Sequence, residues 1–266
     1  MDAKARRDRI KERVRIEREV GYGELAADFD VSEMTIRRDM EALETLGVVR
    51  RVVGGAIALK GKDSEPSFAT RVADAAEEKR HIADAVADLI GPGETLILDS
   101  GSTALAVAQS LRGRRLGLTV LTPSVLAALE LIDEHDTTVV LTGGELRPGE
   151  LSLIGPAAED TLAHYNCDTF VMGVAGIDGN RGISDYHQAD SRVKRAASER
   201  ADRVIVAADR SKLGRVTFTS IAALAEIHVI ITDGDPAHPT LVAARAAGVD
   251  VFCVAGIDSV GEATSL

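Results

Sequence analysis

Apolar positions in the first 45 residues recur at the three- and four-residue spacing of short amphipathic helices. The pattern predicts a charged first helix and a short second helix, with Gly21 and Gly23 interrupting the chain between them. The apolar positions are Ile10, Val14 and Ile16 in the first helix and Leu25, Ala26 and Phe29 in the second. We therefore expect two packed helices that end at a turn near residues 30–32.

A third helix is predicted after Ser32, which is placed to cap it by accepting a bond from a free backbone N–H. Ile36, Met40 and Leu43 form one apolar stripe on this helix, and Gly47 is expected to end it. The face away from the stripe carries Met34, Thr35, Arg37, Arg38 and Thr45. A buried stripe opposite cationic residues predicts the recognition helix of a helix-turn-helix, whose N-terminal half meets bases and phosphates.

Two short β-strands are predicted at residues 49–53 and 56–59, around the tight turn that Gly54 and Gly55 favour. This hairpin forms a wing, and its Arg50 and Arg51 are placed to bind phosphates or the minor groove. The predicted DNA-binding residues are Ser32, Met34, Thr35, Arg37, Arg38, Arg50 and Arg51. The alternative is a protein-interaction arm with solvated arginines.

The charge distribution permits this interpretation although the whole chain has a net charge of −11. Residues 1–59 carry 12 basic and 12 acidic residues, so the excess negative charge lies beyond them. Local patches steer a duplex more than net charge does. The early arginines are bunched in one segment, at Arg6, Arg7, Arg9, Arg13, Arg15 and Arg18.

Beyond a predicted linker at residues 60–67, helical and short apolar segments alternate. A helix is expected near 70–90, and strands near 94–99, 117–122, 137–142, 168–174, 203–208, 227–232 and 249–253. Such alternation predicts an α/β domain with a mostly parallel, helix-covered sheet. We therefore expect a winged helix-turn-helix domain at 1–59 and a larger α/β domain at 68–266.

Composition indicates the cellular compartment and which cofactors to expect. Charged residues interrupt every long apolar stretch, and the N-terminus lacks the apolar core of a secretory signal, so a cytoplasmic protein is expected. Cys167 and Cys253 have no neighbouring ligand cluster, which favours buried reduced thiols over a metal site or a disulfide. No metal and no cofactor are expected.

The best candidate for a ligand site is residues 96–104, where a strand runs into a loop of hydroxyls and glycine and then into a helix. Its backbone N–H groups and the hydroxyls of Ser100, Ser102 and Thr103 are suited to hold a phosphate at the helix N-terminus. Three further loops, at 142–147, 173–178 and 209–212, follow other strands. In a parallel sheet all four loops emerge at one edge, so they are predicted to converge on one polyhydroxylated anion.

Each of these features also has an ordinary structural explanation. The loop at 99–103 is compatible with a simple capped turn, and Gly143 and Gly144 with a plain turn. Arg147 and Lys212 are candidates for surface charges, and Asp209 for a helix cap. Lys194 lies near the start of a helix, where a lysine usually faces solvent.

Several segments together resemble the DeoR family of bacterial regulators of sugar metabolism. In the first domain they are residues 24–27 (ELAA), 31–40 (VSEMTIRRDM) and 47–56 (GVVRRVVGGA). In the second they are residues 99–103 (DSGST), 143–147 (GGELR), 151–156 (LSLIGP), 193–195 (VKR) and 208–212 (ADRSK). The sequence departs from the family pattern at Val53, usually histidine, and at Pro123, often asparagine.

The resemblance implies a sensor domain similar in fold to ribose-5-phosphate isomerase. Its first loop would take the phosphate of an effector, and the later glycine, arginine and lysine positions would line the site. The effector-binding residues so expected are Asp99, Ser100, Gly101, Ser102, Thr103, Gly143, Gly144, Arg147, Gly173, Gly176, Asp178, Lys194, Asp209 and Lys212.

The expected function is therefore a homo-oligomeric transcriptional repressor that binds a double-stranded operator and responds to a phosphorylated sugar. The alternative is a sugar-phosphate isomerase with a DNA-binding appendage. Isomerisation needs a positioned carboxylate, and the related isomerases carry an Asp-Gly-Ala-Asp-Glu stretch. Residues 172–176 (MGVAG) replace it here without any acid, although Asp178 and Asp185 lie nearby. We therefore favour a regulator over an enzyme.

Overall fold

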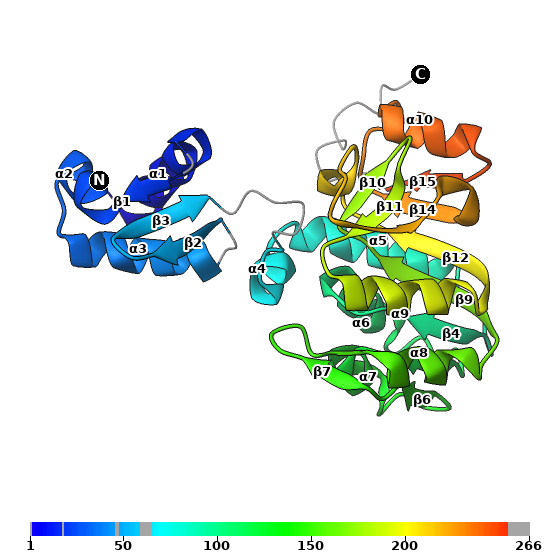
Figure 1. Ribbon diagram of the computed structural model, residues 1–266. Helices are drawn as coiled ribbons and strands as arrows, with labels where there is room; N and C mark the ends of the chain where they lie inside the picture. The colour runs from blue at the N-terminus through cyan, green and yellow to red at the C-terminus, as the bar shows by residue number, and fades with distance from the viewer. Residues whose placement is uncertain (1, 18, 46–47, 59–64, 255–266) are drawn as a thin grey trace, which may run out of the picture. The chain divides into compact units, whose positions relative to one another are not determined.

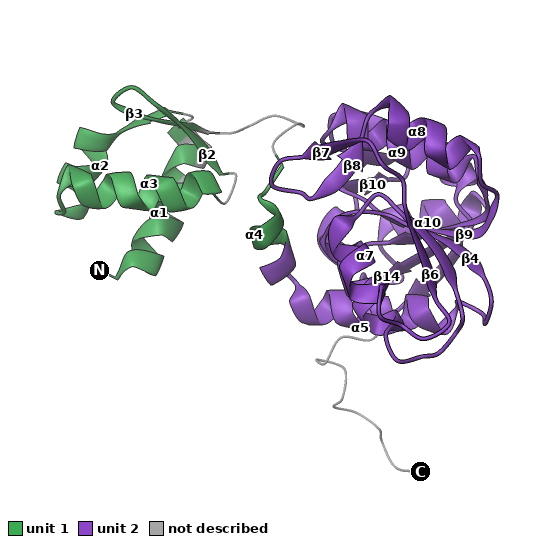
Figure 2. Ribbon diagram, turned by 90° about the horizontal axis from the view of Figure 1, so that it is seen from below, with its two compact units in different colours: residues 1–71 green, residues 72–266 purple. Residues whose placement is uncertain are grey.

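The computed structural model describes residues 2–17, 19–45, 48–58 and 65–254 (Figure 1). The chain divides into two compact units, residues 1–71 and 72–266 (Figure 2). Parts of the predicted organisation lie outside the described residues, namely Arg18, Gly47, Leu59, positions 60–64 of the linker and positions 255–266 of the larger domain.

The first unit contains helices and a small antiparallel sheet in the order β1-β3-β2. Its elements are α1 (Ala3–Glu17), β1 (Glu19–Gly21), α2 (Tyr22–Phe29), α3 (Glu33–Thr45), β2 (Val49–Val52) and β3 (Gly55–Ala58). Ile36, Met40 and Leu43 of α3 have no exposed surface and pack with Ile10 and Leu25 of the first two helices. The predicted stripe is therefore confirmed, and it fixes which face of α3 meets water.

Two local predictions for this unit were wrong. Tyr22 rather than a residue after Gly23 begins α2, because Tyr22 itself belongs to the buried core. The three-residue strand β1 was not predicted, and it changes the role of Gly55. Only Gly54 has a positive φ, +83°, in the wing turn, whereas a Cβ on Gly55 would lie 2.3 Å from the carbonyl oxygen of Val20 in β1.

The second unit is built on a seven-stranded sheet with the order β15-β14-β12-β9-β4-β5-β6, in which every neighbouring pair is parallel. Its strands are β4 (Thr95–Leu98), β5 (Thr119–Thr122), β6 (Thr138–Leu141), β9 (Cys167–Gly173), β12 (Ala201–Ala207), β14 (Val229–Thr232) and β15 (Asp250–Cys253). These are the seven predicted strands, and the predicted parallel sheet is confirmed.

Helices cover both faces of this sheet, which explains why its strands are almost continuously apolar. The helices after residue 67 are α4 (Phe68–Ala73), α5 (Ala76–Asp88), α6 (Ser102–Leu111), α7 (Val125–Leu131), α8 (Pro156–Ala163), α9 (Gln188–Ser198) and α10 (Pro239–Ala246), with short 3₁₀ turns η1 (Arg210–Lys212) and η2 (Leu224–Glu226). Leu96 and Leu98 of β4 pack in the core under α5, α6 and α7. The intervening Ile97 packs in the opposite core, under α8, α9 and α10.

Two features of the second unit differ from prediction. The single helix expected near 70–90 is interrupted at Ala75, whose φ of 52° separates α4 from α5. Two small antiparallel sheets were not predicted, because their strands are three or four residues long. They comprise β7 (Glu145–Arg147) with β8 (Ser152–Ile154), and β10 (Gly176–Asp178) with β11 (Gly182–Asp185) and β13 (Thr219–Ala222).

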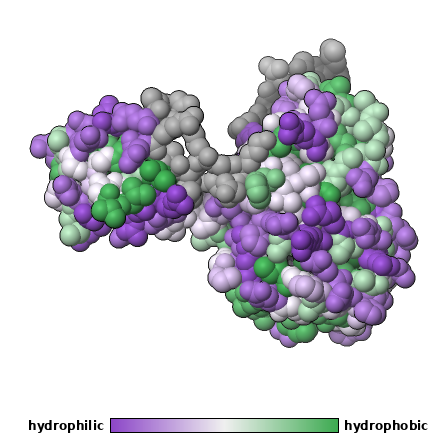
Figure 3. All heavy atoms as spheres, in the orientation of Figure 1, coloured by the Kyte–Doolittle hydropathy of each residue, from purple (hydrophilic) through white to green (hydrophobic). Residues whose placement is uncertain are grey.

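The remaining features of the fold are the hydropathy of its surface, its two cysteines and the length of its helices. The face of the second unit seen in Figure 3 mixes hydrophilic residues with small hydrophobic areas. Cys167 is buried as predicted, whereas Cys253 is only half-buried because it lies in the edge strand β15; both are free thiols. Within the described part of the chain, each helix is too short or too polar to cross a membrane.

Candidate functional site

The exposed face of α3 is the candidate nucleic-acid interface. Arg37 and Arg38 are exposed, as is Met34, with 61% of its surface accessible. Ser32 Oγ accepts the backbone N–H of Thr35 at 3.2 Å and lies 2.9 Å from the Thr35 hydroxyl. Ser32 therefore caps the helix as predicted, and the hydroxyls of Ser32 and Thr35 are engaged in the cap.

Arg37 is positioned by an aromatic ring. Its guanidinium carbon lies 4.8 Å from the centre of the Tyr22 ring, and that ring is buried at the start of α2. A cation over an aromatic face is held by the ring quadrupole while it keeps N–H groups available at its edge. This contact was not predicted, because the sequence does not show that residues 22 and 37 are adjacent.

One of the early arginines is unsuited to DNA contact. Arg6 is buried, and its Nε donates to Asp39 Oδ2 of α3 at 2.5 Å. Arg13 pairs with Glu17 at 2.9 Å and also with Asp28 of α2. Arg6 therefore adds nothing to a cationic surface patch, although it belongs to the bunched arginines of the sequence, because its charge is buried with that of Asp39.

The two wing arginines have different surroundings. Both are exposed, but Arg51 also forms ion pairs with Glu44 at 2.6 Å and Glu41 at 2.8 Å, both in α3. The Arg51 hydrogen bonds hold the pKa of Glu44 below its ordinary value, the backbone bond having the largest effect. Val53, at the tip of the wing, is fully exposed.

The candidate effector site lies where the chain reverses its direction of travel across the large sheet. From β4 the chain proceeds to β5 and β6 on one side, and from β9 to β12, β14 and β15 on the other. The carboxyl ends of β4 and β9 therefore form the topological switch point, the usual ligand site of parallel α/β sheets. The loops at 99–101 and 174–175 leave the sheet at this point.

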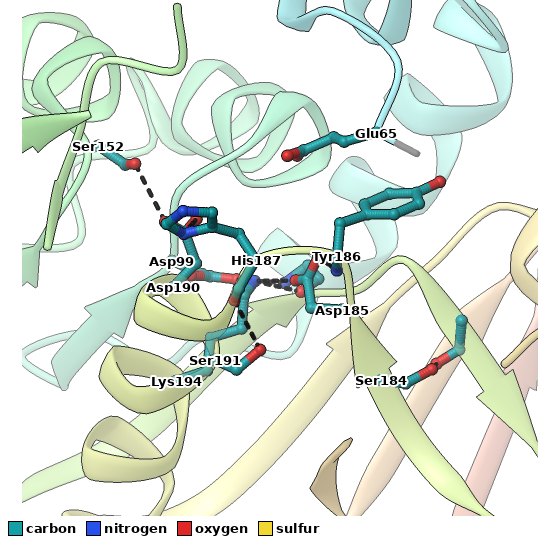
Figure 4. Close-up of polar contacts among 12 residues, drawn as sticks. Glu65, Asp99, Ser152, Ser184, Asp185, Tyr186, His187, Asp190, Ser191 and Lys194 are labelled. Atoms are coloured by element: carbon teal, nitrogen blue, oxygen red, sulfur yellow. Dashed lines mark hydrogen bonds and ion pairs between the residues drawn. The ribbon is translucent and has the colours of Figure 1, made fainter. Parts of the chain in front are cut away.

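A buried ion cluster joins these two loops (Figure 4). Lys194 of α9 contacts Asp99 Oδ2, lies 3.2 Å from Asp185 Oδ2 and donates to the carbonyl oxygen of Gly173 at 2.6 Å. The same oxygen of Asp99 accepts the Gly173 N–H at 2.9 Å. The alternative of a solvent-facing Lys194 is wrong, since Lys194 is buried and Asp99 and Asp185 neutralise its charge.

The charges in this cluster depend on one another. Burial by itself would lower the pKa of Lys194, but Asp99 and Asp185 raise it well above its ordinary value. Burial raises the pKa of Asp99, and the Lys194 ammonium opposes that change. Lys194 therefore remains protonated, and its three N–H donors match the three acceptors around it.

The loop after β4 presents a helix N-terminus at the switch point. Gly101, with φ of 103° and ψ of 172°, adopts a conformation that is almost restricted to glycine. It precedes α6 and supplies no side-chain cap for the first backbone N–H groups of that helix. Ser102 and Thr103 are buried at the helix start, and Ser100 is half-buried. Uncapped N–H groups at a positive helix end favour an anion.

A second polar network lies one turn from Lys194 on α9. Asp190 pairs with Arg147 of β7 at 2.5 Å, accepts from Ser152 Oγ at 3.2 Å and lies 3.0 Å from His187 Nδ1. Figure 4 shows His187 just before α9, Asp190 in its first turn and Lys194 one turn further along. Asp190 and His187 were missed in the sequence, although the four-residue spacing of Asp190 and Lys194 places them on one helix face.

The other predicted effector residues occupy diverse positions. Gly143 and Gly144 are exposed beyond the edge strand β6, and Gly176 begins β10. Asp178 Oδ1 accepts the backbone N–H groups of Asn180 and Arg181 at 3.0 and 2.9 Å, which makes it a turn residue. The structure brings Asp99, Gly173 and Lys194 into direct contact, whereas Arg147 pairs with Asp190, one turn before Lys194 on α9.

Asp209 and Lys212 follow β12, the strand beside β9. Asp209 caps η1 by accepting the Ser211 N–H at 2.9 Å, and Lys212 lies 3.7 Å from its carboxylate. Burial alone would raise the pKa of Asp209, but Lys212 and Ser211 hold it below its ordinary value. The capping role considered for Asp209 is therefore present.

The two units together define a class of protein, a winged helix-turn-helix attached to a parallel α/β domain with a polar switch point. Family models identify residues 6–62 as a DeoR-like helix-turn-helix domain and residues 74–234 as a DeoR C terminal sensor domain. The chain therefore belongs to the DeoR family, and the predicted resemblance is confirmed.

Similar proteins match most of the chain. The HTH-type transcriptional regulator YulB of Bacillus subtilis (strain 168) is 37% identical over 234 residues, 87% of this chain and 90% of that protein. The glycerol-3-phosphate regulon repressor of Escherichia coli (strain K12) is 33% identical over 231 residues, 87% of this chain and 91% of that protein. The ribose 5-phosphate isomerase A structure from Methanocaldococcus jannaschii matches 53% of this chain and 55% of its own, with 18% identity and a TM-score of 0.40.

Proposed function

We propose that this protein is a transcriptional repressor of carbohydrate-metabolism genes whose operator binding is modulated by a phosphorylated sugar. The observation that carries the DNA-binding part is the exposed cationic half of α3, fixed by the complete burial of Ile36, Met40 and Leu43. Repressors among the relatives support the sign of regulation. We propose three segments: a DNA-binding domain at residues 1–59, a linker at 60–67 and a sensor domain at 68–266.

The effector part of the proposal is supported by the polar switch point. The uncapped start of α6 is suited to a phosphate, and the polar groups of Arg147, Ser152 and His187 nearby are suited to hydroxyls. A relative is named for a glycerol-3-phosphate regulon, which fits a small phosphorylated polyol or sugar as effector. In this proposal the Asp99–Lys194 ion pair fixes the position of the loop at 99–101.

Binding without turnover is proposed for this site. Asp178 and Asp185, the carboxylates that follow residues 172–176 in the sequence, are already engaged. Asp185 Oδ2 lies 3.2 Å from Lys194 and its Oδ1 accepts the Tyr186 N–H at 2.7 Å, while Asp178 closes a turn. A sensor needs only a difference in affinity between two conformations, and a coupling of about 1–3 kcal/mol changes operator affinity by roughly 5- to 150-fold.

The test has two arms. Selection of duplexes from a random library should yield an operator that the protein releases when the right sugar phosphate is added. Thermal shift against a panel of sugar phosphates and inorganic phosphate should identify that ligand, since a ligand at 100 times its Kd stabilises the native state by about 2.7 kcal/mol. Analytical ultracentrifugation of the protein bound to this operator gives the number of chains in the complex and so tests the proposed symmetric oligomer. Failure of the selection to yield any duplex would overturn the DNA-binding part. Chemical turnover of the ligand would overturn the proposal of a sensor.

A further inference from the structure

The wing strand β2 presents its two arginines to opposite sides. Successive residues of a strand alternate between faces, so Arg51 shares a face with the fully buried Val49, and Arg50 shares the other with Val52. The Arg51 side chain therefore points toward α3, and the Arg50 side chain points away from it. The adjacent arginines are thus unequal before any contact is considered.

Arg51 is fixed by two glutamates of α3 through three hydrogen bonds. Its backbone N–H donates to Glu44 Oε1 at 2.8 Å, and its Nε donates to Glu44 Oε2 at 2.6 Å. Its Nη1 donates to Glu41 Oε1 at 2.8 Å. The backbone bond also occupies an N–H on the side of β2 away from its partner β3, at the edge of the small sheet. Glu44 thereby binds both the main chain and the side chain of one wing residue.

The local charge around Arg51 disfavours a phosphate. Two carboxylates surround one guanidinium, so the group of three carries a net charge of −1 when all are ionised. Glu44 Oε2 and Glu41 Oε1 each accept one guanidinium N–H, so a DNA phosphate at Arg51 would lie beside two carboxylates that repel it. Arg50 is exposed on the opposite face of the strand, away from these two glutamates, so a phosphate can approach its guanidinium without that repulsion.

We infer that Arg51, Glu44 and Glu41 form a brace that sets the position of the wing relative to the recognition helix, and that Arg50 is the phosphate contact of the wing. Arg51 is then a positioning residue. This inference rests on the proposed DNA-binding function. It separates two arginines that the sequence presents as equivalent.

The brace and simple electrostatics predict opposite changes in DNA affinity when Glu44 is replaced. If only charge mattered, replacing Glu44 by alanine would remove a negative charge near the DNA, release Arg51 and tighten binding. If the glutamate positions the wing, the same replacement weakens binding although the protein becomes less acidic. Glu44→Ala is therefore the deciding variant.

The experiment uses the full chain and a duplex that the wild-type protein selects from a random library, with binding followed by fluorescence anisotropy at several salt concentrations. Arg50→Ala should weaken binding and lower the slope of log K against log salt by about 0.9, because one phosphate contact is lost. Arg51→Ala and Glu44→Ala should each weaken binding by roughly two- to fivefold, the range expected of an exposed ion-pair network, and leave the slope unchanged. Glu24→Ala, at an exposed carboxylate of α2, serves as the matched control.

The outcomes distinguish the brace from the proposed function. Tighter or unchanged binding by Glu44→Ala overturns the brace while the DNA-binding function stands. A loss of salt slope in Arg51→Ala, equal to that in Arg50→Ala, overturns it too. If Glu44→Ala melts at a much lower temperature, Glu44→Gln decides instead, because its amide oxygen can still accept the Arg51 N–H. A smaller loss in the same direction supports the brace, and a gain overturns it. If wild-type protein selects no duplex, the proposed function and the inference fall together.

Discussion

Arg6 of the first helix and Asp39 of the recognition helix form a buried ion pair, with Nε and Oδ2 2.5 Å apart and only 9% and 7% of the side chains exposed. Asp39 stands between Arg38, which faces solvent, and Met40, which lies in the core. The pair therefore fixes the rotation of α3 about its axis. The direction in which the cationic face points depends on a charge that never meets DNA.

Replacing Asp39 by alanine should destabilise the protein by about 3–5 kcal/mol, because an unpaired guanidinium would remain buried. Urea unfolding of the full chain, followed by circular dichroism, measures this loss. The double variant Arg6→Met with Asp39→Leu should recover most of it, since an apolar pair of similar size leaves no charge without a partner. An Asp39→Ala protein within 1 kcal/mol of wild type would show that water reaches Arg6.

Arg38→Ala should weaken operator binding and lower the salt slope by about 0.9, since an exposed arginine on the recognition face contacts about one phosphate. Stability should hardly change, because Arg38 is exposed. Arg112→Ala is the matched control, since Arg112 is an exposed arginine of the sensor unit, with 57% of its side chain accessible. Equal effects of the two replacements would mean that net charge alone drives binding.

Features that depend on local periodicity were predicted correctly, whereas burial that depends on tertiary contacts was not. Seven sheet strands were predicted because strands buried on both faces are continuous apolar runs, and the α3 stripe because helical spacing is local. The strand β1 escaped prediction because three residues, Glu19–Gly21, carry no periodicity. The burial of Lys194 and Arg6 escaped prediction because it depends on carboxylates that only the tertiary fold brings near them.

Lys194→Met should cost about 3–5 kcal/mol of stability, since two buried carboxylates lose their shared cation. The loss should be smaller in acid than at neutral pH, because burial raises the pKa of Asp99 and its protonation removes uncompensated charge. Wild type should show no titration of Lys194 between pH 5 and 9, as the pKa of this ammonium is raised rather than lowered. Chemical unfolding across this range tests both statements, and a variant loss that grows in acid would contradict them.

Asp209 should contribute to stability in a pH-dependent manner. Its pKa is below the ordinary value of 3.8, so the folded state favours the ionised carboxylate. That contribution is fully present above pH 3.8 and is lost as the pH falls through the folded-state pKa. Asp209→Asn, which keeps an acceptor for the Ser211 N–H, should be less stable than wild type at pH 7, with a smaller difference near pH 3. A difference that is constant with pH would remove the ionised carboxylate as its cause.

Ser102→Asp should abolish stabilisation by the effector without unfolding the protein. Ser102 is the first residue of α6, where a carboxylate interacts favourably with the helix dipole, so stability should hold. The same negative charge would repel a phosphate from the N–H groups of that helix end. Ser102→Ala, which adds no charge, is the matched control and should retain most of the response. Thermal shift with the sugar phosphate found by screening, and with inorganic phosphate, provides the measurement. A ligand response that survives Ser102→Asp would place the phosphate at another loop of the switch point.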